Sequence, residues 1–282
     1  MATLAPSRLL LRALLALGAV FLLGVLVIAG MAAWYWSDLP SLDKVTDYRP
    51  RQHLQVTTAD GVEIAEFGSE RRIFVPIAKM PPLMVNALLS VEDWQFREHG
   101  GISLRGLARA VVANLTGGMP QGASTITQQV ARTFFLSTRR TAERKLKEAM
   151  LALQIEHRLS KDQILELYMN QVYLGQRAYG FAAAAQVYFG KPVDQLDVAQ
   201  AAMLAGLPQN PNYANPIANL ERAKARQQVV LQRMRETGVI DDATRERALA
   251  ETLVLRSPGR TDVHAEFVAE MARQAVVERL GD

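Results

Sequence analysis

The chain has 282 residues, 49% hydrophobic and 21% charged, which excludes a disordered chain, a collagen and a coiled-coil rod. It contains no Cys, so a disulfide framework, a zinc finger, an iron–sulfur site and a thiol nucleophile are excluded as well. The formal net charge is +4, and residues 131–160, with seven Lys/Arg against three Asp/Glu, carry an excess of that size. This segment is explained by a solvated basic helix or by a site for an anionic ligand, and no nucleic-acid motif accompanies it.

The N-terminal segment has the features of a membrane anchor. An uncharged run from Ala13 to Ser37 follows two Arg residues and contains Trp-Tyr-Trp near its end, as at a membrane interface. A helix of this length exceeds the ~30 Å hydrocarbon core. A cleaved signal peptide is the alternative, but its apolar part usually has only ~7–15 residues. We expect residues 1–12 in the cytoplasm, an uncleaved transmembrane helix over 13–36, and all that follows in the periplasm.

A linker and a small β element are expected at 37–75. The hydrophobic alternation at 53–58 and 62–67, on either side of an Asp-Gly turn, predicts two strands, and 72–75 is a candidate third strand. This element lies between the membrane helix and the rest of the chain.

Helices dominate after Pro82. Apolar residues repeat with the helical period over 104–115, and a Gly-rich loop follows at 116–120. Thr125 and Ser160 are each followed three residues later by Gln, which predicts two capping boxes, and Gly175 is expected to end the second helix. Further helices are expected over 178–189, 197–206, 219–236, 242–252 and 264–280. The fold class is therefore mainly α, with a small β entrance.

Adjacent acids occur at Glu92 and Asp93, after an apolar helical run. Phe96, His99 and a Gly-Gly turn follow them. Acids beside aromatic and apolar residues can have raised pKa values, which suits acid–base catalysis near neutrality. The alternative is a helix end with surface acids.

Small hydroxyls and amides gather at the predicted helix start near residue 125. They are Ser124, Thr125, Thr127, Gln128 and Gln129. A helix N-terminus offers free N–H groups and a positive dipole, which attract phosphate. An N-cap with a polar first turn is the alternative.

The basic segment contains Arg144, Lys145 and Glu148. A helical wheel places Glu148 on an apolar stripe, with Arg144 one turn earlier on the same side. A carboxylate there is expensive to bury without a compensating role. The alternative is an ordinary i, i+4 pair, worth only ~0.3–0.5 kcal/mol.

Four motifs occur together in one order. They are Glu-Asp-x-x-Phe-x-x-His-x-Gly at 92–101, Gly-x-Ser-Thr-Ile-Thr-Gln-Gln at 122–129, Arg-Lys-x-x-Glu at 144–148 and Lys-x-x-Ile-Leu-Glu-x-Tyr-x-Asn at 161–170. With them the chain resembles the family 51 peptidoglycan glycosyltransferases over about residues 40–282. The resemblance implies a lysozyme-like helical glycosyltransferase domain at 76–237.

The remaining stretch, 238–282, resembles the helical connection of a class A penicillin-binding protein toward its transpeptidase domain. No Ser-x-Asn or Lys-Thr-Gly motif follows, and the Ser-x-x-Lys at 41–44 lies in the linker, where we take it as coincidence. We expect the sequence to be an N-terminal part, cut or truncated, of such a two-domain protein. A dedicated one-domain enzyme would not need this stretch.

The resemblance implies that the enzyme polymerises lipid II into β-1,4-linked glycan with inversion and releases undecaprenyl pyrophosphate. Glu92 would be the general base, with Asp93 and His99 shaping its surroundings. Glu148 would act at the donor side, through Mg²⁺ or Mn²⁺ or by positioning groups around the pyrophosphate. The cations of the same motif, Arg144 and Lys145, would bind the phosphates.

Further substrate contacts are implied in the same way. The residues concerned are Asp93, Phe96, His99, Ser124, Thr125, Thr127, Gln128, Gln129, Arg132 and Asn170. Arg132 stands where the family usually has Lys, and a guanidinium also binds phosphate, bidentately.

The implied partners are lipid II, the growing lipid-linked glycan, the inner membrane and other cell-wall synthesis proteins, with no nucleic acid and no organic cofactor. The phosphoglycolipid moenomycin, which inhibits the family at the donor site, is expected to bind. A lysozyme-like lytic transglycosylase is the alternative function, and it needs no basic cluster beside a second carboxylate. A non-catalytic membrane scaffold would need neither acid. For the apolar face of 104–115, burial in the core and insertion among lipid headgroups are both open.

Overall fold

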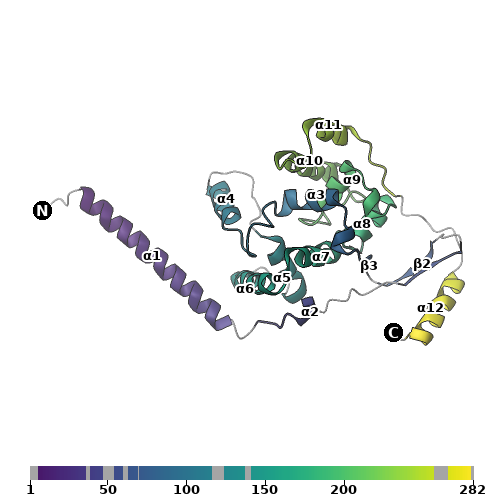
Figure 1. Cartoon of the computed structure of the whole chain (residues 1–282), viewed down its shortest axis with the longest axis horizontal. Coiled ribbons are helices and arrows are strands. Elements are labelled where there is room, and N and C mark those ends of the chain that lie inside the picture. Colours follow the sequence, from purple (N-terminus) through teal and green to yellow (C-terminus); the bar gives the residue numbers. More distant parts are fainter. Residues whose placement is uncertain are drawn as a thin grey trace.

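Helices make up most of the protein, as a computed structural model shows (Figure 1). The structure describes residues 6–35, 39–46, 54–59, 63–68, 70–115, 124–136, 141–256 and 266–280. The mainly α class is confirmed, and the described strands form two small two-stranded sheets. The predicted loop at 116–120 lies outside the described residues.

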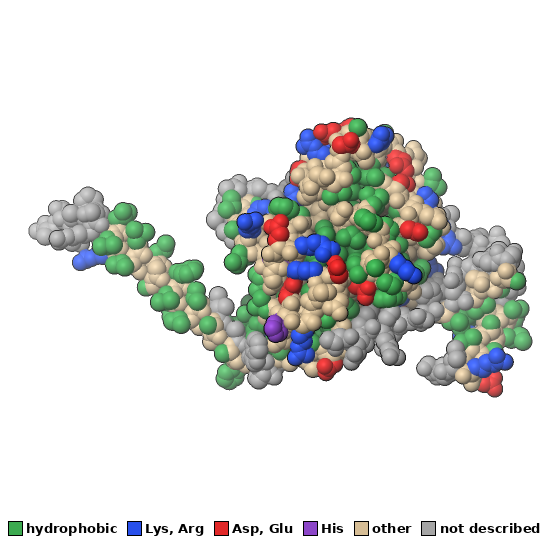
Figure 2. Space-filling model, in the orientation of Figure 1, with side chains coloured by type: hydrophobic (Ala, Val, Ile, Leu, Met, Phe, Trp, Pro, Cys, Tyr) green, Lys and Arg blue, Asp and Glu red, His purple; other side chains and the backbone are tan. Residues whose placement is uncertain are grey.

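The first helix, α1 (Pro6–Tyr35), stands away from the rest of the molecule (Figure 1). Its stretch Leu10–Tyr35 reaches a mean hydropathy of 2.7 and is not buried by the protein. Figure 2 shows hydrophobic side chains along its length, with a basic side chain near its N-terminal end. By length and composition, α1 can cross a membrane. It begins earlier than the span predicted at 13–36, because the two flanking Arg residues are also helical.

The segment after α1 packs on the helical domain. It contains α2 (Asp43–Thr46), and Leu42 and Val45 beside and within this short helix are buried. The end of α1 contacts the domain too, since the Lys147 ammonium lies 4.8 Å from the centre of the Tyr35 ring. The described part of the predicted linker is therefore attached to the domain surface.

The predicted hairpin consists of β1 (Leu54–Thr57) and β2 (Glu63–Phe67), which pair antiparallel. The C-terminal helix α12 (Glu266–Leu280) packs against it. The predicted third strand at 72–75 is wrong in extent, because β3 contains only Arg71–Arg72.

The partner of β3 is a distant segment. It pairs in parallel with β4 (Ala178–Tyr179) and is not part of the hairpin. The strand does not continue because the backbone of Val75 bonds to a side chain, that of Asn170, at 2.8 and 2.9 Å.

The helical domain follows the predicted order. Its elements are η2 (Ile77–Lys79), α3 (Pro82–Glu92), α4 (Leu104–Leu115), α5 (Ile126–Phe135), α6 (Ala142–Arg158), α7 (Lys161–Gln171), α8 (Phe181–Phe189), η3 (Val193–Gln195), α9 (Val198–Ala205), α10 (Leu220–Glu236) and α11 (Asp242–Ala250). Most bounds lie within a few residues of the predicted ones. The helix expected from 178 starts three residues later because β4 occupies its beginning. The helix opened by Ser160 ends at Gln171, before Gly175.

Both predicted capping boxes are present. The Thr125 hydroxyl accepts from the Gln128 backbone N–H at the start of α5, and Ser160 and Gln163 make the same arrangement at α7. Each box satisfies backbone donors that a helix start leaves unpaired. These caps fix where α5 and α7 begin.

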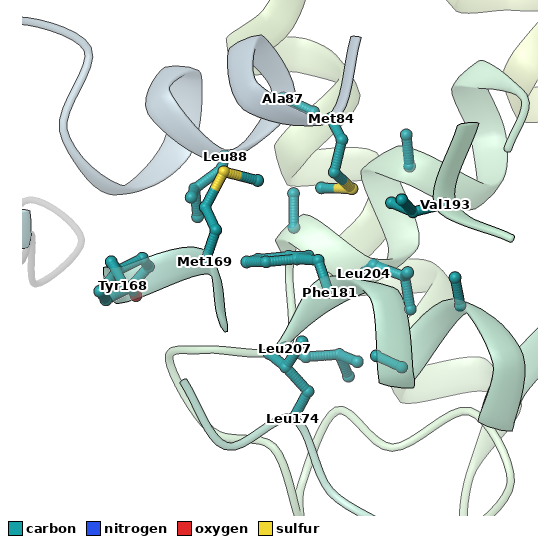
Figure 3. Close-up of a cluster of buried hydrophobic side chains, with 14 of the residues drawn as sticks. Met84, Ala87, Leu88, Tyr168, Met169, Leu174, Phe181, Val193, Leu204 and Leu207 are labelled. Carbon is teal, nitrogen blue, oxygen red and sulfur yellow. The ribbon is translucent and has the colours of Figure 1, made fainter. Parts of the chain in front are cut away.

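The hydrophobic core joins helices that are distant in sequence. Figure 3 shows Leu88 of α3, Met169 of α7 and Phe181 of α8 in one cluster, with Tyr168 at its edge. All four side chains are buried. Leu88 and Met169 thus bring α3 and α7 into one core, and α3 packs further on α9 and α10.

Candidate active site

Glu92 is the last residue of α3, and its carboxylate is held by one defined donor. Gln129 Nε2 of α5 donates to Glu92 Oε2 at 2.8 Å, and Gln129 Oε1 accepts from the Tyr168 hydroxyl of α7 at 3.1 Å. The Tyr168 hydroxyl donates to the amide oxygen of Gln129, so the amide nitrogen is the atom that faces Glu92. Three helices thus determine the position of one acid.

Burial raises the pKa of Glu92 above the ordinary value of a glutamate, and Asp93 nearby raises it further. The hydrogen bond from Gln129 and the charges of Arg226 and Arg132 oppose this, but burial has the larger effect. Burial also raises the pKa of Tyr168, so this hydroxyl stays protonated as a donor. A carboxyl with a raised pKa suits proton transfer near neutrality.

Arg226 of α10 is a member of this site that sequence analysis missed. It is close enough to Glu92 that each group shifts the pKa of the other. Burial has the larger effect on this guanidinium and lowers its pKa. Its Nε also donates to the carbonyl oxygen of Gly206 at 3.3 Å. On a helix with five Lys/Arg residues, no local pattern distinguished this arginine from its neighbours.

Asp93 connects the first two motifs. Its carboxylate accepts from the backbone N–H of Ile126, the first residue of α5, at 3.0 Å. His99 Nε2 lies 3.0 Å from each of its oxygens. A carboxylate at a helix N-terminus interacts favourably with the helix dipole. Asp93 therefore orients α5, which carries Gln129, relative to Glu92.

The start of α5 is occupied by protein groups. The N–H of Ile126 bonds to Asp93 and that of Gln128 to the Thr125 hydroxyl, while this hydroxyl donates to the carbonyl oxygen of Gly101 at 2.6 Å. The interpretation of this segment as an N-cap is confirmed. Two of the N–H groups considered for phosphate binding are already used.

A second cluster surrounds Glu148 of α6, whose side chain is only 1% exposed. Its two oxygens bond to Arg144 and, at 3.0 Å, to Lys145 Nζ. Lys145 Nζ also donates to the Ser124 hydroxyl at 2.8 Å and is half exposed. The cluster has two cations and one carboxylate, so its net charge is positive. Lys145 is the more exposed of the two cations.

A resident divalent cation does not fit Glu148 in this arrangement. Both carboxylate oxygens bond to cations, which would repel a metal ion. Among the described residues, no group of three or more His, Cys, Asp or Glu side chains could hold one.

Three predicted binding residues have structural partners instead. Phe96 is fully buried, and Thr127 donates to Glu156 Oε1 at 2.5 Å. Asn170 bonds to the backbone of Val75 on both of its amide atoms. These three side chains hold the elements around the site in place.

The two clusters share helix α5 and its neighbour α6. Gln129 and Arg132 extend from α5 toward Glu92, and Ser124, just before α5, contacts Lys145 of α6. α5 and α6 pack directly on each other. The buried acid Glu92 is bonded to α5, and the cationic cluster lies on α6, which packs on α5. Such a pair of groups can take a proton from one atom while it stabilises an anion on another.

Comparison with known proteins identifies the family of this chain and several similar proteins. The transglycosylase family model matches residues 60–235. Penicillin-binding protein 1A of Neisseria lactamica is 50% identical over 93% of this chain and 33% of its own length. The Escherichia coli protein of the same name is 46% identical over 93% of this chain and 31% of its own length.

A crystal structure of penicillin-binding protein 1A from Haemophilus influenzae is 30% identical, with a TM-score of 0.49, covering 83% of this chain and 25% of that one. The chain spans about a third of the length of the curated relatives it matches. The family match covers more than half of the chain and includes all four motifs. The chain therefore belongs to the transglycosylase family.

Proposed function

We propose that this chain is a peptidoglycan glycosyltransferase that polymerises lipid II into β-1,4-linked glycan strands. The observation that carries the proposal is the buried Glu92, with its raised pKa, on the same helical framework as the Arg144–Lys145–Glu148 cluster. The transglycosylase family and the relatives named penicillin-binding protein 1A support the same reaction class.

In the proposed reaction, Glu92 accepts the proton of the acceptor sugar's 4-hydroxyl. That oxygen forms a bond to the anomeric carbon of the growing chain, while the bond from this carbon to the lipid pyrophosphate breaks. Attack opposite the leaving group inverts the configuration. The proton leaves Glu92 for solvent, and the electron pair of the broken bond leaves with the pyrophosphate.

The charge that develops on the pyrophosphate requires preorganised cations. These cations are Arg144 and Lys145. The buried Glu148 bonds to both and holds them in position. Glu148 is thus a positioning residue for the donor side. The Mg²⁺ or Mn²⁺ expected from the family resemblance would be held by the pyrophosphate more than by this carboxylate.

The membrane location of the substrates fits the surface of the protein. We propose that α1 crosses the inner membrane with its N-terminus in the cytoplasm and that the helical domain lies in the periplasm. On α4, Leu104, Leu107 and Val112 are 75%, 50% and 58% exposed, so their burial in the core is excluded. This apolar face would enter the headgroup region, close to lipid II. At the same membrane the domain would also contact other cell-wall synthesis proteins.

The lytic transglycosylase is the competing function. A hydrolase-like enzyme also needs a buried acid, but its substrate has no pyrophosphate, so the Arg144–Lys145–Glu148 cluster would have no role. The relatives and the family match do not favour it.

Polymerisation of purified lipid II by the full chain in detergent tests the proposal. We expect glycan strands to form, and moenomycin to bind at micromolar concentration or below and to stop the reaction. Cleavage of purified sacculi without polymerisation would overturn the proposal in favour of a lytic enzyme. Absence of moenomycin binding would contradict the assignment of the donor site.

A further inference from the structure

A polar network lies behind the loop that carries His99. Lys161, the first residue of α7, donates from Nζ to Glu156 Oε1 at 2.7 Å and to the backbone carbonyl oxygen of His99 at 2.5 Å. The same ammonium lies 4.4 Å from the centre of the Phe96 ring. Nothing in the proposed chemistry uses this lysine, although it opens the fourth sequence motif.

The loop has a second fixed point two residues further on. Gly101 has a φ of +89°, and a Cβ there would lie 2.9 Å from the carbonyl oxygen of Ala152 in α6. Its own carbonyl oxygen accepts from Thr125 at 2.6 Å. Lys161 and Thr125 thus hold two successive parts of the loop, through the carbonyl oxygens of residues 99 and 101.

The His99 side chain links this part of the loop to the adjacent acids Glu92 and Asp93. With its backbone held by Lys161, His99 places Nε2 between the two oxygens of Asp93, which in turn accepts from the first N–H of α5. Glu92 is the neighbour of Asp93 in sequence and is bonded by Gln129 of the same helix. A displacement of the His99 backbone would therefore move both supports of Glu92.

The network is largely shielded from solvent. The side chains of Lys161 and Glu156 are 22% and 10% exposed. Glu156 also accepts from Thr127, so one carboxylate joins α5, α6 and α7. In such surroundings a charge-assisted hydrogen bond is stronger than at the surface and has a better defined direction.

We propose that Lys161 is a positioning residue for the reaction: it fixes the His99 backbone, and through His99 and Asp93 it sets the place of Glu92. This inference rests on the proposed function of Glu92 as the base. Among the described residues, no hydrogen bond or ion pair joins Lys161 to the Arg144–Lys145–Glu148 cluster, so the lysine acts on the acid–base side of the site alone.

The test compares Lys161→Met, which keeps the aliphatic stem, with Lys161→Arg, which keeps the donor charge. Lys191→Met is the control, since Lys191 donates to the side chain of Gln200 in α9 instead. In lipid II polymerisation by the full chain, we expect Lys161→Met to lower kcat about 10- to 100-fold, because small misplacements of a catalytic group have effects of this size. The KM for lipid II and the affinity for moenomycin are expected to stay within about twofold, and the acidic limb of the pH profile to shift. We expect Lys161→Arg to recover part of kcat.

An unchanged kcat and pH profile in Lys161→Met would overturn the inference, as would a parallel loss of kcat and moenomycin affinity, which indicates a general structural role. If Lys161→Met does not fold, Glu156→Gln weakens the hold on the ammonium while keeping an oxygen for Thr127, and it is expected to lower kcat alone. Failure of the wild-type chain to polymerise lipid II would overturn the proposed function itself, whereas normal wild-type polymerisation with a fully active Lys161→Met overturns only this inference.

Discussion

At the scale of single residues, the acid–base properties of Glu92 result from opposing contributions of known direction. Burial raises its pKa, and the donor Gln129 and the cations Arg226 and Arg132 lower it. A general base works only when deprotonated, so activity is expected to fall as the pH drops through this raised pKa. Any change that removes a nearby positive charge raises the pKa further and moves this acidic limb to higher pH.

Arg226→Met provides the corresponding prediction. The variant removes the charge and keeps most of the side-chain stem, so the acidic limb of kcat/KM for lipid II is expected at higher pH than in the wild type. Arg222→Met is the matched control, because Arg222 lies one turn earlier on α10 and stacks on Tyr213 instead. A limb that stays in place, or moves to lower pH, would contradict the effect assigned to Arg226.

Sequence analysis identified most of the residues in the two clusters but not all of their roles. Glu92, Gln129 and Glu148 stand in compact motifs whose neighbours in sequence are also neighbours in space. Tyr168 belongs to the fourth motif and places a hydroxyl among buried residues of α7, a signal that could have pointed to its role. Arg226 could not be predicted, because its approach to Glu92 depends on how α10 packs against α3.

At the scale of elements, α6 carries two kinds of ion pair. The buried Glu148 bonds to Arg144 and Lys145, whereas Glu143, whose side chain is half exposed, makes an i, i+4 pair with Lys147 at 2.9 Å. Pairs of the second kind contribute only ~0.3–0.5 kcal/mol to stability. Only the cluster around the buried Glu148 is expected to matter for catalysis.

Glu148→Gln tests this difference. Without the carboxylate, Arg144 and Lys145 repel each other and lose their common anchor, so polymerisation is expected to fall about 100-fold or more, even with excess Mg²⁺. Glu143→Gln on the same helix is expected to retain near-wild-type polymerisation. Equal activities of the two variants would show that burial of Glu148 has no catalytic consequence.

The helices themselves could be predicted because their signals are local. Capping residues and the helical period of apolar residues determined α4, α5 and α7 to within a few positions. The short parallel pairing of β3 with β4 could not be predicted. The two strands lie more than a hundred residues apart in sequence, and neither has a hydrophobic pattern of its own.

At the scale of the whole molecule, the anchor and the helical domain are joined by a packed segment. Leu42 is 4% exposed in the domain core, and Tyr35 at the end of α1 lies against Lys147 of α6. Since α6 also carries Glu148, the donor-side cluster is tied to the end of the membrane helix. Under the proposed function, this attachment would keep the cluster close to substrates held in the membrane that α1 crosses.

Glu92→Gln tests whether this buried glutamate is the base for glycan polymerisation. In lipid II polymerisation by the full chain, the variant is expected to lose at least ~100-fold in kcat, the usual contribution of a general base. Its helical circular dichroism and moenomycin binding are expected to stay unchanged. Glu98→Gln, on an acid of the following turn that is 59% exposed, serves as the control and is expected to polymerise normally. A near-wild-type yield of glycan from folded Glu92→Gln would contradict the account.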